Sequence, residues 1–148
     1  MDQLRDGIVR VLKEAFPTHE ASIRPFTALL DEQTDVQISY PSTGMLVCIL
    51  PITEAPDDIP WELRANFGLV VTMKAASAIE RDKLGWKLCM QVAQVVYRNC
   101  WGIERMNITP AVITGIQKNE ARTPDGAPTG INYWTILFYN YVKFEAVV

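Results

Sequence analysis

The hydrophobic positions of the C-terminal segment, residues 130–144, predict a β-strand with two apolar faces. Aromatic and β-branched residues dominate this segment, and such a composition is typical of strands. Successive side chains of a strand point to opposite sides of its sheet. One side would carry Trp134, Ile136, Phe138, Val142 and Phe144, and the other would carry Ile131, Tyr133, Leu137, Tyr139 and Tyr141. A small antiparallel sheet usually has one apolar and one solvated face, so the second apolar face indicates a contact with another subunit.

The other strands are predicted from shorter patterns. A short extended piece is expected at residues 22–26, and the continuous apolar run at residues 45–50 is typical of a buried central strand. Residues 62–75 alternate between apolar and polar side chains, which predicts a half-buried strand. Residues 108–116 are expected to form a strand that pairs with residues 131–144.

Two segments have the apolar spacing of amphipathic helices. The first runs from Asp2 to Phe16, and Pro17 is expected to end it. The second runs from Ser77 to Cys100, with Gly102 as its expected stop. The element order is therefore α-β-β-β-α-β-β. This order predicts an α+β fold for residues 1–148, in a single domain with an antiparallel or mixed sheet and two helices packed on it.

The second helix has one narrow polar stripe. The members of this stripe recur every three or four residues and are Lys83, Lys87, Gln91, Gln94 and Arg98. The remaining faces are apolar, and Trp86 and Met90 broaden the face that should meet the sheet. Because a helix exposed along only one stripe is contacted on more than one side, Trp86 and Met90 are candidates for contact with a partner subunit.

A polar segment at residues 117–130 is expected to form a long loop between the last two strands. Its Pro-Asp-Gly sequence at residues 124–126 is a turn signal, but the segment exceeds the usual two to five residues of a hairpin connection. Long loops carried by firm strands often make contacts. The candidate contact residues here are Lys118, Asn119, Glu120, Arg122 and Asp125, together with Tyr133, Tyr139 and Tyr141, whose rings suit a partly buried interface.

An acidic, proline-rich segment at residues 51–60 is a second candidate contact. It contains three prolines, which exclude regular strand pairing. Its acidic residues are Glu54, Asp57 and Asp58, and they would act through charge complementarity with a partner. Asp57 and Asp58 are interpreted as a solvated acidic turn rather than as cation ligands.

Composition and charge mainly exclude classes of function. The chain has 148 residues, of which 49% are hydrophobic and 21% charged, so it is expected to fold and not to be disordered. A net charge of −3 without a basic cluster gives no support for nucleic-acid binding. No apolar run approaches the roughly 20 residues of a membrane span, and the charged N-terminus is unlike a signal peptide. The odd number of cysteines (Cys48, Cys89 and Cys100) predicts reduced thiols and a cytoplasmic place of assembly.

The sequence contains no recognisable set of catalytic, metal-binding or cofactor-binding residues. His19 is the single histidine and is interpreted as a solvated loop residue. No Cys-x-x-Cys pair, nucleophile elbow or glycine-rich phosphate loop is present. We therefore expect no enzyme activity, no cofactor and no metal. The alternative is a small α+β enzyme or ligand-binding domain, with Trp61, Trp101 and Tyr133 around a pocket.

In order and size, the predicted elements resemble the tail terminator proteins of tailed bacteriophages, especially those of Mu-like contractile phages. The features that carry the resemblance are the helix that ends at Pro17, the proline turn and buried run at residues 41–50, the strand after it, the long second helix and the terminal hairpin. The resemblance covers nearly the whole chain and rests on element order, not on a sequence motif.

The resemblance implies a structural protein of the virion tail that is assembled in the host cytoplasm. Proteins of this family form a six-membered ring on the last ring of the tail tube, stop its polymerisation and present a surface for joining the head. The implied partners are further copies of the chain, the tail-tube protein, and the sheath and neck proteins. A closed ring needs two different patches on each subunit. Another head–tail neck or completion protein is an alternative with the same element order.

Overall fold

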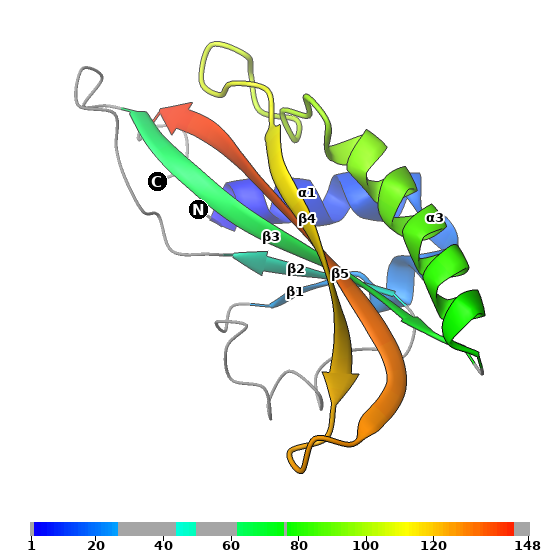
Figure 1. Ribbon diagram of the computed structural model, residues 1–148. Coiled ribbons are helices and arrows are strands. Elements are labelled where there is room, and N and C mark those ends of the chain that lie inside the picture. Colours follow the sequence, from blue (N-terminus) through cyan, green and yellow to red (C-terminus); the bar gives the residue numbers. More distant parts are fainter. Residues whose placement is uncertain (1, 27–43, 50–61, 76, 144–148) are drawn as a thin grey trace.

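The computed structural model describes residues 2–26, 44–49, 62–75 and 77–143. It has an α+β fold with a five-stranded sheet in the order β1-β2-β3-β5-β4 (Figure 1). Neighbouring strands are antiparallel except β1 and β2, which are parallel. The elements are α1 (Asp2–Ala15), the 3-10 helix η1 (Pro17–Ser22), β1 (Arg24–Phe26), β2 (Gly44–Ile49), β3 (Glu62–Lys74), α3 (Ala78–Val96), β4 (Val112–Arg122) and β5 (Pro128–Lys143). The predicted fold class and element order are confirmed, with η1 as an addition.

The core lies between one face of the sheet and the two helices. Strands β3 and β5 form its floor, because Val71 faces Trp134, Leu69 faces Ile136 and Phe67 faces Phe138 across the ladder. All six of these side chains are buried, and complete burial of a large apolar side chain contributes about 1.5–3 kcal/mol. The helices α1 and α3 supply the opposing layer (Figure 1).

The apolar stripe of α1 explains how this helix docks. Leu4, Ile8 and Leu12 recur every four residues and are fully inaccessible to solvent, so one side of the helix faces the core. The helix ends at Ala15, before Pro17, which begins η1. The predicted end near Pro17 is therefore confirmed, although His19 lies in η1 and not in a loop.

The second helix, α3, is shorter than predicted. Ser77 caps its N-terminus, since its hydroxyl accepts a hydrogen bond of 3.1 Å from the Glu80 amide. The helix ends at Val96 and does not reach Cys100. The Arg98 amide instead donates to the Ala111 carbonyl at 3.1 Å, and this partner distant in sequence replaces the next helical bond. Gly102 lies in a later turn, so the prediction that it stops the helix is wrong.

The predicted long loop at residues 117–130 is also wrong. Strands β4 and β5 continue through most of it, with Glu120 opposite Asn132 and Arg122 opposite Pro128, and only residues 123–127 form the connection. β4 is an edge strand whose polar side chains face solvent, and register shifts near residues 114 and 121 interrupt its alternation. The strand also begins later than predicted, because Ile108 forms only an isolated bridge with Val142.

Candidate functional site

The distal part of the β4–β5 ribbon projects beyond the rest of the sheet (Figure 1). The last residue of β3, Lys74, pairs with Ile131 of β5. The β5 residues that precede Ile131 therefore pair with β4 alone. We call residues 119–130 the arm, of which the first two still lie opposite Tyr133 and Asn132, residues of β5 that pair with β3. Four sequence-predicted contact residues lie on it: Asn119, Glu120, Arg122 and Asp125. Their side chains lie on a paired ribbon, which holds them in more fixed positions than the expected loop would.

Hydrogen bonds within the arm fix the shape of its tip. The Arg122 guanidinium donates to the Gly126 carbonyl at 3.0 Å and pairs with the Glu120 carboxylate at 3.1 Å. The Thr123 amide donates to the Ala127 carbonyl at 2.8 Å. The Thr123 hydroxyl donates to the Asp125 carboxylate and holds the pKa of Asp125 below its ordinary value. The tip is therefore a defined surface, and the positive φ of Gly126 completes its turn.

The base of the arm is attached to α3 through Asp82. The Lys118 ammonium lies 2.6 Å from the Asp82 carboxylate, and the Asn132 amide donates to the same oxygen at 3.0 Å. Lys118 belongs to β4 and Asn132 to β5, so one carboxylate holds both strands of the ribbon. The hydrogen bond from Lys118 is the main cause that lowers the pKa of Asp82 below its ordinary value. Sequence patterning did not identify this contact, because it depends on how α3 packs on the ribbon.

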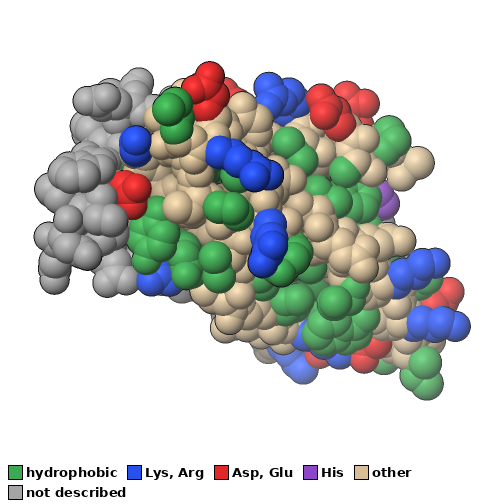
Figure 2. Space-filling view, turned by 90° about the horizontal axis from the view of Figure 1, so that it is seen from above, with side chains coloured by type: hydrophobic (Ala, Val, Ile, Leu, Met, Phe, Trp, Pro, Cys, Tyr) green, Lys and Arg blue, Asp and Glu red, His purple; other side chains and the backbone are tan. Residues whose placement is uncertain are grey.

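The outward side of α3 carries large apolar side chains. Four of them lie on one side of the helix, and we call this set the α3 surface: Ile79 (83% exposed), Trp86 (40%), Met90 (48%) and Tyr97 (60%). Their spacing of seven, four and seven residues places them on one side of the helix. Trp86 and Met90 were predicted contact residues, whereas Ile79 and Tyr97 were missed, although the same spacing could have identified them. Figure 2 shows hydrophobic side chains that reach the surface between Lys and Arg side chains.

The sheet face opposite the helices carries the three candidate tyrosines. Tyr133, Tyr139 and Tyr141 alternate with the buried core residues of β5 and are half-buried. The rings of Tyr139 and Tyr141 meet edge to face at 5.4 Å, and the Arg64 guanidinium lies 4.0 Å from the centre of the Tyr139 ring. Burial raises the pKa of Tyr133. This aromatic face is thus separated from the α3 surface by the thickness of the molecule.

The aromatic pocket considered in the sequence analysis is not formed by Trp101 and Tyr133. Trp101 is buried on the helix side of the sheet, where its ring lies 5.7 Å from that of Phe138 and its indole N–H donates to the Asn140 side chain at 3.0 Å. Tyr133 lies on the other face, and Trp61 lies outside the described residues. The acidic candidates Glu54, Asp57 and Asp58 lie outside them as well.

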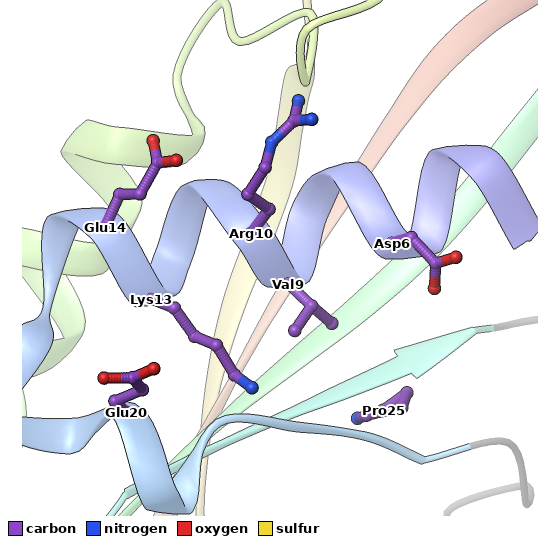
Figure 3. Close-up of a pocket in the computed structure, with 7 residues that line it drawn as sticks. All are labelled: Asp6, Val9, Arg10, Lys13, Glu14, Glu20 and Pro25. Atoms are coloured by element: carbon purple, nitrogen blue, oxygen red, sulfur yellow. The ribbon is translucent and has the colours of Figure 1, made fainter.

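A groove of about 560 Å³ lies between α1 and the segment that contains η1 and β1 (Figure 3). Val9 and Lys13 point toward this segment, whereas Arg10 and Glu14 point to the other side of α1 (Figure 3). The charged groups at the groove are of both signs and include no nucleophile with an adjacent base. Within the described ranges, no three His, Cys, Asp or Glu residues are grouped so as to hold a metal ion.

The cysteines whose side chains are described are free thiols. Burial raises the pKa of the Cys89 thiol to about 11, so this thiol is protonated at neutral pH. Cys89 and Cys100 form no disulfide, and the side chain of Cys48 lies outside the described part of the chain. In that part, no helix is both long and apolar enough to cross a membrane.

Comparison with known proteins gives a match at the level of the fold. No protein-family model and no curated protein sequence matches the chain. Among solved structures, a chain from the virion of a native gene transfer agent particle has a TM-score of 0.59 with this chain and 11% sequence identity. The match covers 92% of this chain and 91% of that chain. The two proteins therefore share a fold across nearly their whole length.

Proposed function

We propose that this chain is a structural virion protein without enzyme activity that forms a ring on the end of a tail tube. The ring stops polymerisation of the tube at its finished length and provides the surface to which the head is joined. Its partners are five further copies of the chain, the tail-tube protein, and the sheath and neck proteins beside it. It acts in the tail of the particle, after assembly in the host cytoplasm.

The observation that carries this proposal is the fold shared with a chain of a gene transfer agent virion. The match runs through nearly all of both chains, so it is not confined to a common supersecondary motif. The element order that resembles tail terminators supports the finer assignment to the tail.

The surfaces of the molecule also suit a ring subunit. A closed ring needs a heterologous contact, in which one patch of each subunit meets a different patch of the next. The α3 surface and the tyrosine face lie on opposite sides of the molecule, and the arm projects from one end. A rigid arm of this kind can reach a neighbouring subunit or the tube ring below it.

Native mass measurement by light scattering tests the proposal. The full chain is measured alone at several concentrations, and again after preassembled tubes of the tail-tube protein from the same particle are added. We expect a discrete oligomer of six copies in at least one condition and retention of the chain on tubes. A chain that remains monomeric in both and does not bind tubes would overturn the proposal. A ring that ignores tubes but binds a neck protein would assign the chain to the head–tail joint instead.

A further inference from the structure

From Lys83 onward the exposed side of α3 combines apolar groups with positive charge, whereas its first turn carries the exposed Glu80. Between residues 83 and 103 the chain has no Asp or Glu, and its charged residues there are Lys83, Lys87 and Arg98. All three are exposed, and the Arg98 guanidinium lies 5.3 Å from the centre of the Tyr97 ring. Beyond its first turn the α3 surface is therefore an apolar strip bordered by cations, and this part would favour a partner that is both apolar and acidic.

The chain itself contains a segment of this chemistry. Residues 50–61 carry three carboxylates, at Glu54, Asp57 and Asp58, and none of the 14 lysines and arginines of the chain. The same segment contains four large apolar residues, which are Leu50, Ile52, Ile59 and Trp61. Its three prolines restrict the backbone before binding, so less conformational entropy is lost when the segment is ordered against a surface.

We propose that the α3 surface of one copy binds residues 50–61 of a neighbouring copy. This inference rests on the proposed ring, and it names the pair of unlike patches that a heterologous contact requires. The cations at Lys83 and Lys87 face the carboxylates of the neighbour, while Trp86 and Met90 receive its apolar side chains.

The lengths of the two partners are compatible. Eighteen residues separate Ile79 from Tyr97, which corresponds to about 27 Å along a helix. An extended segment of 12 residues spans up to about 40 Å. Both ends of the segment are held by the sheet, since Ile49 pairs with Phe67 and Glu62 begins β3, so residues 50–61 can cover the part of the α3 surface around Trp86 and Met90 but not all of it. The segment at residues 27–43 is also acidic but contains a single proline, Pro41. It would therefore lose more conformational entropy on binding than residues 50–61 would.

A labelled peptide tests this contact without any need for tails. The probe is a synthetic peptide of residues 50–61 with an N-terminal fluorophore, and its anisotropy is measured as the full chain is added. We expect binding that weakens at least tenfold between 0.05 and 0.5 M salt. The double variant Lys83→Glu, Lys87→Glu should bind at least tenfold more weakly. A peptide with Glu54→Lys, Asp57→Lys and Asp58→Lys should bind this variant better than it binds the original chain.

The matched control is the double variant Lys13→Glu, Arg24→Glu, which makes the same change in net charge away from α3 and should bind the original peptide normally. Absence of peptide binding, or binding that is equally weakened by the control, would overturn the inference. If the α3 variant still forms rings on tubes and the peptide does not bind, the inference fails while the proposed function stands. If the peptide binds as expected but no ring forms on tubes, the contact stands and the proposed function fails.

Discussion

Gly85 of α3 lies directly against the indole ring of Trp134 on β5. A methyl group placed on Gly85 would come within 1.9 Å of Cη2 of this ring, so only glycine allows α3 to approach the sheet this closely. The adjacent Trp86 meets the same indole edge to face, with ring centres 6.0 Å apart. This contact sets the rotation of the helix, and as a result Met90 and Tyr97 point outward.

The substitution Gly85→Ala should therefore destabilise the protein. We expect the free energy of unfolding to fall by about 1–3 kcal/mol, because overpacking against a rigid ring costs more than the gain of up to about 1 kcal/mol from the higher helix propensity of alanine. Urea unfolding followed by circular dichroism measures the change. Gly115→Ala is the control, since a methyl group at Gly115 meets nothing within 4 Å. Equal effects of the two substitutions would contradict the proposed role of Gly85.

The bond between Lys118 and Asp82 should be visible in a titration. The pKa of Asp82 in the folded chain is below its ordinary value of 3.8, and Lys118→Met should raise it toward that value. Because the folded pKa is the lower one, the ionised group stabilises the fold above the unfolded pKa. This contribution is lost as the pH falls through the folded pKa. NMR of the carboxyl carbon measures the pKa. Lys83→Met is the control and should not change it, and no change in Lys118→Met would show that this ion pair is absent in solution.

Asn140 should be required for the stability of the segment after α3. Its side chain accepts the Trp101 indole N–H at 3.0 Å and donates to the main-chain carbonyls of Asn99 and Thr109 at 3.2 and 2.8 Å. Asn140→Ala leaves the buried Trp101 indole N–H without a partner, whereas the Asn99 carbonyl keeps the Ala111 amide as its donor. We therefore expect the free energy of unfolding to fall by about 1–3 kcal/mol. Asn119→Ala, at an exposed position on the arm, should change it by less than about 0.5 kcal/mol. Denaturant unfolding of both variants by tryptophan fluorescence distinguishes these outcomes.

Removal of the arm should separate folding from assembly. Glu120 and Asn132 face each other across the ribbon, so residues 121–131 can be replaced by an Asn-Gly turn that joins them directly. This variant keeps the contacts of Asp82 with Lys118 and Asn132. We expect cooperative unfolding and the original circular dichroism spectrum, but loss of binding to tail tubes in a pelleting assay. Glu104→Gln, an exposed substitution outside the arm, is the control, and normal tube binding by the shortened variant would exclude the arm as a contact.

The sequence predicted the fold best where burial determines the pattern. The strand expected at residues 62–75 is confirmed as β3, but the prediction that it is half-buried is wrong, because residues 67–72 are buried on both faces. The prediction failed for the ribbon at residues 117–130, where polar side chains of an edge strand face solvent and leave no apolar period. It also failed at the end of α3, where the Arg98 amide bonds to Ala111, a partner that no local pattern indicates.

The candidate contact residues were predictable only in part, for a related reason. Trp86 and Met90 were identified because they made the helix too apolar for a single core face, and the structure leaves both exposed. The attachment of the arm through Asp82 joins residues 36 and 50 positions apart in the chain. It follows from the packing of α3 on the ribbon and not from any spacing in the sequence.

Electron microscopy of tail tubes shows directly whether the chain forms a ring at the tube end. Tail-tube protein from the same particle is assembled with and without the full chain, and tube ends and tube lengths are compared. We expect one additional ring at a tube end and no further growth of the tubes that carry it. Tubes that continue to grow in the presence of the chain, with no additional density at their ends, would contradict it.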